Sequence, residues 1–315
     1  MSMRIISPGP LSTIQDMGRW GYMQFGFSPS GALDSDAAKI ANLLVLNKET
    51  EAVIEMTMFG ITAEFTNHNV IAITGGDFSP TINGKPVPMY TAIEVSPRDV
   101  LVCGLAKTGC RGYIAVSGGF DIPSVMGSKS TNLKCSIGGF LGRKLLAGDV
   151  LKLSDPQETV WRIEKRKYNA APIEKGSVKI RVVCGLQKEY FTDEGIHTFF
   201  SNEYTVTPDS DRMGMKLDGP EIKSKTGVDI ISDAIPLGGI QIPSSGKPII
   251  MLCDRQTTGG YAKLGTVISA DIPKLAQLTP HQKISFVEVS LEEAQRICRE
   301  QAKKIRKFKM YMKIL

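Results

Sequence analysis

The 315-residue sequence lacks several features that would place it in a special class of protein. It has no stretch of about 18 uncharged apolar residues, the length that a membrane-crossing helix needs. Its first thirty residues contain no apolar run of the kind found in signal peptides. Its six cysteines are scattered, with neither a Cys-x-x-Cys spacing nor a histidine pair beside them, so no zinc site or redox motif is predicted. We therefore expect a cytoplasmic protein with reduced thiols and no membrane partner.

Common catalytic motifs are also missing. The chain has no Gly-x-x-x-x-Gly-Lys-Ser/Thr loop for phosphates and no Gly-x-Gly-x-x-Gly after a strand. Its only histidines, His68, His197 and His281, do not stand at metal-ligand spacing, so no metal site is predicted. Each histidine is interpreted as a surface residue, although a Ser-His pair formed in space stays open.

Positive charge is concentrated at one end of the chain. There are 38 Lys+Arg against 32 Asp+Glu, a formal net charge of +6. Residues 303–315 hold six bases and no acid, which leaves 32 bases against 32 acids in residues 1–302. A neutral body offers no electrostatic footprint for nucleic acid. The basic run predicts a solvated helix end whose removal leaves activity intact, with docking on an acidic partner surface as the alternative.

Short apolar runs rich in β-branched residues dominate the remaining sequence and predict a mainly β protein, a β-rich α+β fold with few short helices. The clearest predicted strands are 70–74, 99–103, 112–116, 178–184, 228–231, 248–253 and 283–289. Helices are predicted over 35–46, capped by Asp34 or Ser35, and over 291–307, where Ser290 and Glu293 form a capping box. The polar segment 155–177 predicts a domain boundary. We expect domains at 1–165 and 175–290, followed by a C-terminal surface helix and basic tail at 291–315.

Three groups of loops are dense in glycine, arginine, aspartate and hydroxyl residues. The first, residues 10–34, supplies Gln15, Asp16, Arg19, Ser30 and Asp34. It could bind a ligand, or it could be a turn held by an Asp16–Arg19 ion pair. The second, residues 127–132 and 138–143, could cradle an anion beside Lys129 and Arg143 but could equally be plain hairpins.

The third group is the densest and spans 210–214, 232–233, 238–243 and 254–261. Arginine side chains such as Arg212 and Arg255 suit the capture of a carboxylate or phosphate. Gln241 and Gln256 offer both a donor and an acceptor, which fits an amide edge. Structural ion pairing of Asp254 with Arg255 is the alternative interpretation.

These segments resemble a known family along most of the chain. The matching stretches include Thr13-Ile-Gln-Asp-Met-Gly-Arg-Trp-Gly21, Ser30-Gly-Ala-Leu-Asp34, Thr74-Gly-Gly-Asp77, Arg111-Gly-Tyr-Ile-Ala-Val-Ser-Gly-Gly119, Ser210-Asp-Arg-Met-Gly214 and Asp254-Arg-Gln-Thr-Thr-Gly-Gly-Tyr261. The sequence is similar to the KipA-like family, also called allophanate hydrolase subunit 2 or the biotin-dependent carboxyltransferase-like family. The pattern resembles most the C subunits of bacterial ATP-dependent 5-oxoprolinase.

The resemblance implies two cyclophilin-like β-barrel domains and a hydrolase that opens the cyclic amide 5-oxoproline to glutamate. The resemblance alone implies that ATP is a co-substrate. It also implies two partners, a KipI-like B subunit and a lactam-utilisation A subunit. For this reaction we expect Asp16, Asp34 and Asp254 as the catalytic carboxylates that position groups or water. The expected substrate-binding residues are Arg19, Arg212, Gln241, Arg255, Gln256 and Tyr261.

Two alternative functions stay open at this point. The chain could be the carboxyltransferase component of a biotin-dependent urea carboxylase or allophanate-type system, with biotin carried elsewhere because no Met-Lys-Met sequence occurs here. It could also be a non-catalytic antagonist of a KipI-like kinase inhibitor.

Overall fold

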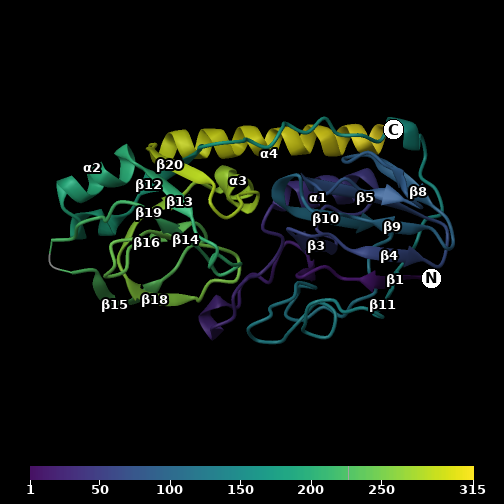
Figure 1. The fold of residues 1–315 in the computed structure, drawn as a ribbon, viewed down its shortest axis with the longest axis horizontal. Coiled ribbons are helices and arrows are strands. Elements are labelled where there is room, and N and C mark those ends of the chain that lie inside the picture. Colours follow the sequence, from purple (N-terminus) through teal and green to yellow (C-terminus); the bar gives the residue numbers. More distant parts are fainter. Residues whose placement is uncertain (226) are drawn as a thin grey trace. The chain divides into compact units, whose positions relative to one another are not determined.

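A computed structural model describes residues 1–225 and 227–315 of the chain. These residues form two compact units. Unit 1 comprises residues 1–20, 30–173 and 304–315, and unit 2 comprises residues 21–29 and 174–303. Figure 1 shows the elements of both units along the chain. Each unit is therefore assembled from segments that are far apart in the sequence.

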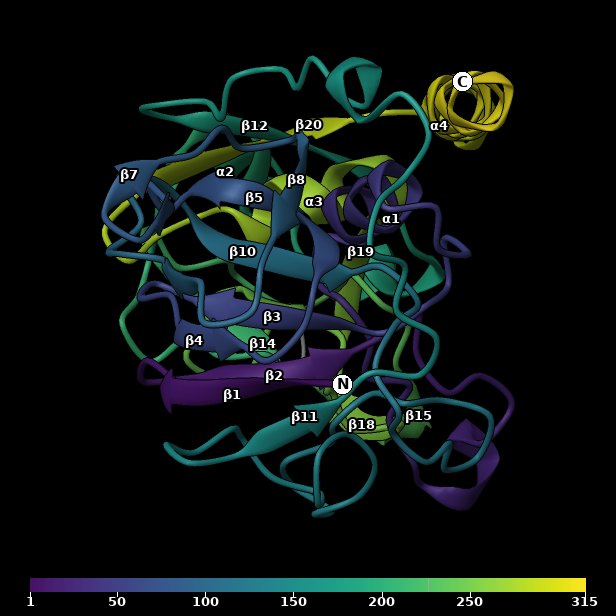
Figure 2. The same ribbon diagram turned by 90° about the vertical axis from the view of Figure 1, so that its right-hand side faces the viewer.

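Unit 1 is built on two antiparallel sheets. The six-stranded sheet has the order β11-β1-β4-β9-β6-β7, and the five-stranded sheet has the order β2-β3-β10-β5-β8. The strands are β1 (Ser2–Ser7), β2 (Ser12–Gln15), β3 (Val53–Thr57), β4 (Thr62–Phe65), β5 (Asn69–Asp77), β6 (Thr81–Ile82), β7 (Lys85–Pro86), β8 (Ala92–Val95), β9 (Val100–Val102), β10 (Thr108–Val116) and β11 (Val150–Lys152). Figure 2 shows β5, β10 and β3 as neighbours in the five-stranded sheet.

The five-stranded sheet is buried on both faces, which explains why its strands read as nearly continuous apolar runs. On β10, Ile114 and Val116 face the core shared with the six-stranded sheet. The alternate residues Tyr113 and Ala115 join a second core, because successive side chains of a strand point to opposite faces.

Helical segments cover the outer face of this sheet. Helix α1 (Ser35–Leu44) contributes Ile40 and Leu44 to the second core and begins at Asp34, whose carboxylate accepts a hydrogen bond from the Ala37 amide at 2.9 Å. Ile305, Phe308 and Met312 from the end of α4 (Leu291–Ile314) belong to the same core. The outer layer of unit 1 is thus formed by residues from both ends of the sequence.

Unit 2 is a closed seven-stranded barrel of order β12-β19-β16-β17-β14-β13-β20, with a two-stranded sheet, β15-β18, beside it. The strands are β12 (Val178–Cys184), β13 (Glu203–Val206), β14 (Gly214–Asp218), β15 (Asp229–Ala234), β16 (Gly239–Gln241), β17 (Ile249–Met251), β18 (Thr258–Tyr261), β19 (Lys263–Val267) and β20 (Lys283–Glu288). Parallel pairing of β12 with β20 closes the barrel. Helices α2 (Asp193–Ser201) and α3 (Ile272–Ala276) and the 3-10 helices η1 (Met23–Phe25), η2 (Ile163–Lys165), η3 (Leu186–Tyr190) and η4 (Ser269–Asp271) complete the fold.

The mainly β prediction is confirmed, and each predicted strand overlaps an observed one. Ser290 caps α4 as predicted, accepting a hydrogen bond from the Glu293 amide at 3.2 Å. The basic residues at the end of this helix are mostly exposed, as the predicted solvated run requires, but the prediction that the helix ends at residue 307 is wrong. The helix continues to Ile314, and its apolar stripe extends through Phe308 and Met312, which are 9% and 2% exposed. The lysines of this segment occupy the opposite side, so the basic run and the buried stripe are two faces of one helix.

All six cysteines have free thiols, and Cys103, Cys110 and Cys253 are buried. Across residues 1–225 and 227–315, no helix has both the length and the apolar character needed to span a membrane.

Candidate functional site

Asp16 organises a polar loop cluster in unit 1. It follows β2 directly, and its Oδ1 accepts hydrogen bonds from the Ser128 and Ser130 hydroxyls, each at 2.6 Å, and from the Gly18 amide at 2.7 Å. Its Oδ2 accepts from the Lys129 amide at 2.6 Å. A carboxylate with four donors is already saturated. Asp16 therefore holds the loop around residues 128–130 in place and is poorly suited to accept a proton from a substrate.

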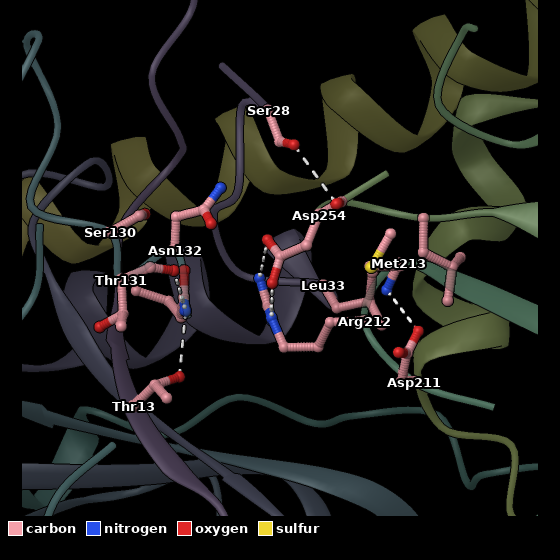
Figure 3. A network of polar contacts seen from close by, with 12 residues as sticks. Thr13, Ser28, Leu33, Ser130, Thr131, Asn132, Asp211, Arg212, Met213 and Asp254 are labelled. Atoms are coloured by element: carbon pink, nitrogen blue, oxygen red, sulfur yellow. Dashed lines mark hydrogen bonds and ion pairs between the residues drawn. The ribbon is translucent and has the colours of Figure 1, made fainter. Parts of the chain in front are cut away.

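Gln15, the preceding residue, ties two loops to the same strand end. Its amide nitrogen donates to the Thr13 hydroxyl and to the Thr131 carbonyl, at 3.0 and 3.1 Å. Its amide oxygen accepts from the Gly31 amide at 3.1 Å. Figure 3 shows the contact with Thr13 next to Ser130, Thr131 and Asn132. The cluster thus joins the loops that follow β2 and precede α1.

A second part of the cluster fixes the start of α1. The Glu55 carboxylate accepts from the Leu33 amide at 2.9 Å and from the Tyr113 hydroxyl at 2.8 Å. The same hydroxyl accepts from the Asp34 amide at 2.8 Å. Burial, followed by the charges of Glu55 and Asp34, raises the pKa of Tyr113 well above its ordinary value. Tyr113 therefore stays protonated, which lets it donate to Glu55 while it accepts from Asp34.

Arg19 is fully buried in unit 1, and its Nη2 donates to the Ser130 carbonyl. A Cβ at Gly138 would collide with both the Ser130 carbonyl and the Arg19 guanidinium, and Gly138 has φ of +65°. Glycine is required here because no side chain fits the space and the backbone is left-handed. Residues 10–20 and 30–34 of the first predicted loop therefore pack with the second, residues 127–132 and 138–143, in unit 1.

The densest predicted group contains a buried ion pair in unit 2. The Arg212 Nε donates to Asp254 Oδ2 at 2.9 Å, and its Nη2 donates to Oδ1 at 3.3 Å. Figure 3 shows this two-pronged contact. The two side chains are 6% and 8% exposed. Asp254 is paired with Arg212, rather than with its sequence neighbour Arg255 as the structural alternative supposed.

Arg255 is buried among main-chain carbonyls. Its Nε donates to the Ile235 carbonyl at 2.8 Å and its Nη1 to the Leu252 carbonyl at 3.2 Å. Ser28 donates to the Arg255 carbonyl at 2.6 Å, so the segment 21–29 is attached to this strand end. Burial lowers the pKa of Arg255 from its ordinary value. The guanidinium of Arg255 thus ties this strand end to Ile235, and its main-chain carbonyl ties it to Ser28.

Gln241 is the last residue of β16, one of the barrel strands, and is 2% exposed. Within the described part of the chain, its buried Nε2 has no hydrogen-bond acceptor. A Cβ added at Gly259 would lie only 2.9 Å from this nitrogen and 2.7 Å from the Ile235 side chain, so the backbone of Gly259 packs closely against the amide. A buried amide donor without an acceptor costs about 1–3 kcal/mol. Such a group is retained at a cost in stability, which is typical of a site that receives a ligand.

The last two predicted substrate-binding residues lie outside these buried networks. Gln256 is exposed in the connection between β17 and β18, and Tyr261 is 40% exposed at the end of β18, paired with Asp229 of β15. Neither is positioned by a side-chain hydrogen bond that the structure records. They can contact a ligand only at the rim of the unit 2 group.

Sequence reasoning missed Glu55, Tyr113, Ser128 and Ser130 as members of the cluster in unit 1. Glu55 and Tyr113 stand between apolar residues in the interiors of their strands, and a polar residue in such a run is the signal that could have identified them. No group of three or more histidine, cysteine, aspartate or glutamate side chains in the described residues could hold a metal ion.

The barrel, the packed sheets and the motif-bearing loops place the chain in a class of carboxyltransferase-type proteins. A family model, "Carboxyltransferase domain, subdomain A and B", matches residues 25–288, and the chain belongs to this family.

Two relatives match over nearly their full length. The chain is 37% identical over 289 residues to the C subunit of 5-oxoprolinase from Haemophilus influenzae, covering 92% of each protein. It is 36% identical over 292 residues to the C subunit of 5-oxoprolinase from Escherichia coli, covering 93% of each. The crystal structure of Kluyveromyces lactis urea amidolyase is also similar, with a TM-score of 0.91 and 31% identity. That match covers 98% of this chain but only 20% of the amidolyase.

Proposed function

We propose that this protein is the C subunit of an ATP-dependent 5-oxoprolinase, which hydrolyses 5-oxoproline to glutamate. The observation that carries the proposal is the extent of similarity: the chain matches two 5-oxoprolinase C subunits over 92–93% of their length. Its proposed partners are a KipI-like B subunit, together with a lactam-utilisation A subunit. We also propose a cytoplasmic location, which the free thiols support.

In this proposal, Gln241 binds the ring amide of the substrate. Its Nε2 is a buried donor that lacks an acceptor within the described chain, and the lactam oxygen is an acceptor. A fixed donor at that oxygen stabilises the negative charge that develops when water attacks the carbonyl carbon. Gly259 packs closely against this nitrogen, so the substrate ring would have to approach it from another side.

The remaining predicted residues of unit 2 then act around Gln241. Arg255, held by main-chain carbonyls, keeps a positive charge buried in this unit, whereas the charge of Arg212 is balanced by its pair with Asp254. We propose that this charge attracts the substrate carboxylate, while Gln256 and Tyr261 contact the ligand from the rim. Asp254 serves by fixing the Arg212 guanidinium, since its own oxygens are occupied by that pair.

In unit 1, the proposed roles of Asp16, Arg19 and Asp34 are also positional. Asp16 accepts four hydrogen bonds and Asp34 caps α1, so neither carboxylate is arranged as a general base. The hydrogen bonds that Asp16 and Asp34 accept shape the loops that carry the family motifs.

The arginines do not fit a triphosphate site. Arg212 is committed to Asp254, and Arg255 to the Ile235 and Leu252 carbonyls. A triphosphate needs several uncommitted donors, such as those of a phosphate loop, and the sequence has no such loop. We therefore propose that ATP is bound by one of the partner proteins.

The test is reconstitution with the A and B subunits and measurement of glutamate released from 5-oxoproline with ATP. Gln241→Ala should lower kcat/KM about 10²-fold or more, the usual loss when one oxyanion donor is removed. Gln295→Ala, on the exposed face of α4, is the matched control and should retain wild-type turnover. Wild-type turnover by a folded Gln241→Ala variant would refute the role of Gln241, and absence of turnover by the wild-type assembly would refute the function.

The urea amidolyase match supports a second candidate, the carboxyltransferase component of a biotin-dependent urea carboxylase. This function requires a biotin carrier on another chain. Avidin added to the reconstituted assembly separates the two candidates, because it blocks a biotin-dependent reaction and leaves 5-oxoproline hydrolysis unchanged. Tight binding of a KipI-like protein without any turnover would instead support the non-catalytic antagonist.

A further inference from the structure

Unit 1 contains a cavity that shares no residue with the clusters described above. Its volume is about 600 Å³, within the usual range of small-molecule sites. The cavity is lined by residues of β5, the β6–β7 hairpin, the start of β10 and the segment 171–173. It includes Gly75 and Asp77 of the motif Thr74-Gly-Gly-Asp77, to which the proposed function gives no role.

The cavity lies where the pairing of β5 with β10 is interrupted. Thr108 pairs with Asp77 and Gly112 with Gly75, so three residues of β10 stand opposite a single residue of β5. Bulges of this kind bend a strand and redirect its side chains, and they are common beside binding sites.

Gly75 is required at this point of the cavity wall. It has φ of +90°, and a Cβ there would collide with the Arg111 carbonyl. The Tyr90 hydroxyl accepts from the Gly75 amide at 3.0 Å and lies 3.3 Å from the Gly75 carbonyl. The interruption is thus fixed by a left-handed glycine and a tyrosine that bridges both of its main-chain groups.

The charges of the lining differ in their availability. The Asp77 Oδ1 accepts from the amide and hydroxyl of Ser79, at 2.8 and 3.3 Å, so this oxygen is occupied locally. Lys107, whose amide donates to the Asp77 carbonyl at 2.7 Å, is the only cation among the described lining residues. Its ammonium makes no ion pair with any of residues 1–225 or 227–315.

The rest of the lining combines apolar side chains with hydroxyls. Val87, Met89 and Ile173 offer apolar surface, and Thr81 and Thr108 offer hydroxyl groups. One available cation next to one carboxylate favours a ligand with a single negative charge, because Asp77 would repel a second one. We propose that this cavity binds a small monocarboxylate with an apolar body, whose carboxylate pairs with Lys107.

The probe is 4-methylpentanoate, and its uncharged counterpart is 4-methylpentanamide. Binding to the full chain is measured by calorimetry and by ligand-observed saturation transfer. We expect saturable binding of the acid and binding of the amide at least about tenfold weaker, since a hydrogen bond to a charged group contributes about that factor or more.

Two variants locate the site. Lys107→Met should weaken binding of the acid about tenfold or more, and Val87→Trp should abolish it by filling the cavity. Lys152→Met, an exposed lysine of the same unit outside the cavity, should bind as the wild type does. No saturable binding by the wild type, equal binding of acid and amide, or wild-type binding by both cavity variants would overturn the proposal. The assay involves no turnover, so its outcome is independent of the proposed function.

Discussion

Individual charged residues in this chain differ sharply in what surrounds them. Arg212 and Asp254 form a pair with 6% and 8% exposed side chains, whereas Arg296 forms pairs with Glu293 and Glu300 on the exposed surface of α4. Removing one member of a buried pair strands a charge away from water, but an exposed charge that loses its partner is simply hydrated. Residue type alone therefore does not indicate the effect of a substitution.

We expect Arg212→Ala to lower the free energy of unfolding by about 3–5 kcal/mol, because Asp254 would remain buried and charged. Arg296→Ala should cost less than about 1 kcal/mol. The combined Arg212→Met and Asp254→Leu variant should recover much of the loss, since it removes both charges. Urea unfolding measures all three, and equal losses for the two single variants would contradict the buried pair.

The pair of Arg143 with Asp149 predicts a dependence on pH. Arg143 donates to both carboxylate oxygens at 2.7 and 2.8 Å, and this contact holds the pKa of Asp149 below its ordinary value. A depressed folded-state pKa stabilises the protein above the unfolded value of about 3.9, and the contribution disappears as the pH falls through the lower folded-state value. The wild type should exceed Asp149→Asn by about 1 kcal/mol from pH 7 to about 5, with the difference shrinking below about pH 4. A difference that stays constant down to about pH 2, measured by urea unfolding, would contradict this assignment.

At the scale of elements, the end of α4 has a basic exposed side and an apolar buried side. Five lysines and Arg306 near its end produce the +6 surplus of the chain, while Ile305, Phe308 and Met312 recur at helical spacing on the buried side. Tyr168 packs edge-on against Phe308 at 4.8 Å between ring centroids. Arg166 is almost fully buried and donates to the Met312 carbonyl at 3.2 Å. The basic end of the chain is therefore a structural part of unit 1.

Phe308→Ala should lower the free energy of unfolding by about 3–5 kcal/mol, as expected for a large buried side chain. Lys307→Gln, one residue earlier on the exposed side, should change it by less than about 0.5 kcal/mol. Thermal and urea unfolding supply the measurement. Deletion of residues 304–315 should also reduce activity through loss of structure, and full stability after that deletion would show that the segment is dispensable.

At the scale of the whole molecule, the two units are interleaved along the chain. Residues 21–29 belong to unit 2 although they lie within the N-terminal part, and residues 304–315 belong to unit 1 although they end the sequence. The core of unit 1 can therefore form fully only after residues 304–315 have been synthesised.

Cleavage after Lys175 tests this interleaving. Lys175 is exposed and precedes Gly176, whose φ is +100°, in the polar segment that the sequence marks as a boundary. Limited trypsin digestion there should give two fragments that migrate apart under denaturing conditions but elute together from a sizing column, since residues 304–315 remain in the core of unit 1. Phe308→Ala should weaken the association of the nicked fragments, and separate elution of the wild-type fragments would contradict the assignment.

Much of the local structure was predictable because it depends on short-range signals. Short apolar runs rich in β-branched residues located the strands, Asp34 and Ser290 marked the starts of α1 and α4, and the motifs between residues 13 and 261 indicated the family. The same signals indicated that Asp16, Arg212 and Asp254 belong to important loops. The roles of these residues did not follow, because a role depends on which partner is within hydrogen-bonding distance.

The sequence by itself thus determined the mainly β class, the caps of two helices and the position of the basic run. Only the tertiary structure decided that Asp254 pairs with Arg212, which is 42 positions away, and that Asp16 is saturated by residues 128–130. It also decided that one side of the basic helix end, with Ile305, Phe308 and Met312, is buried in the core of unit 1. The physical reason is that charge, cap and periodicity are properties of neighbours in sequence, whereas burial and pairing arise from residues that meet only when the chain has folded.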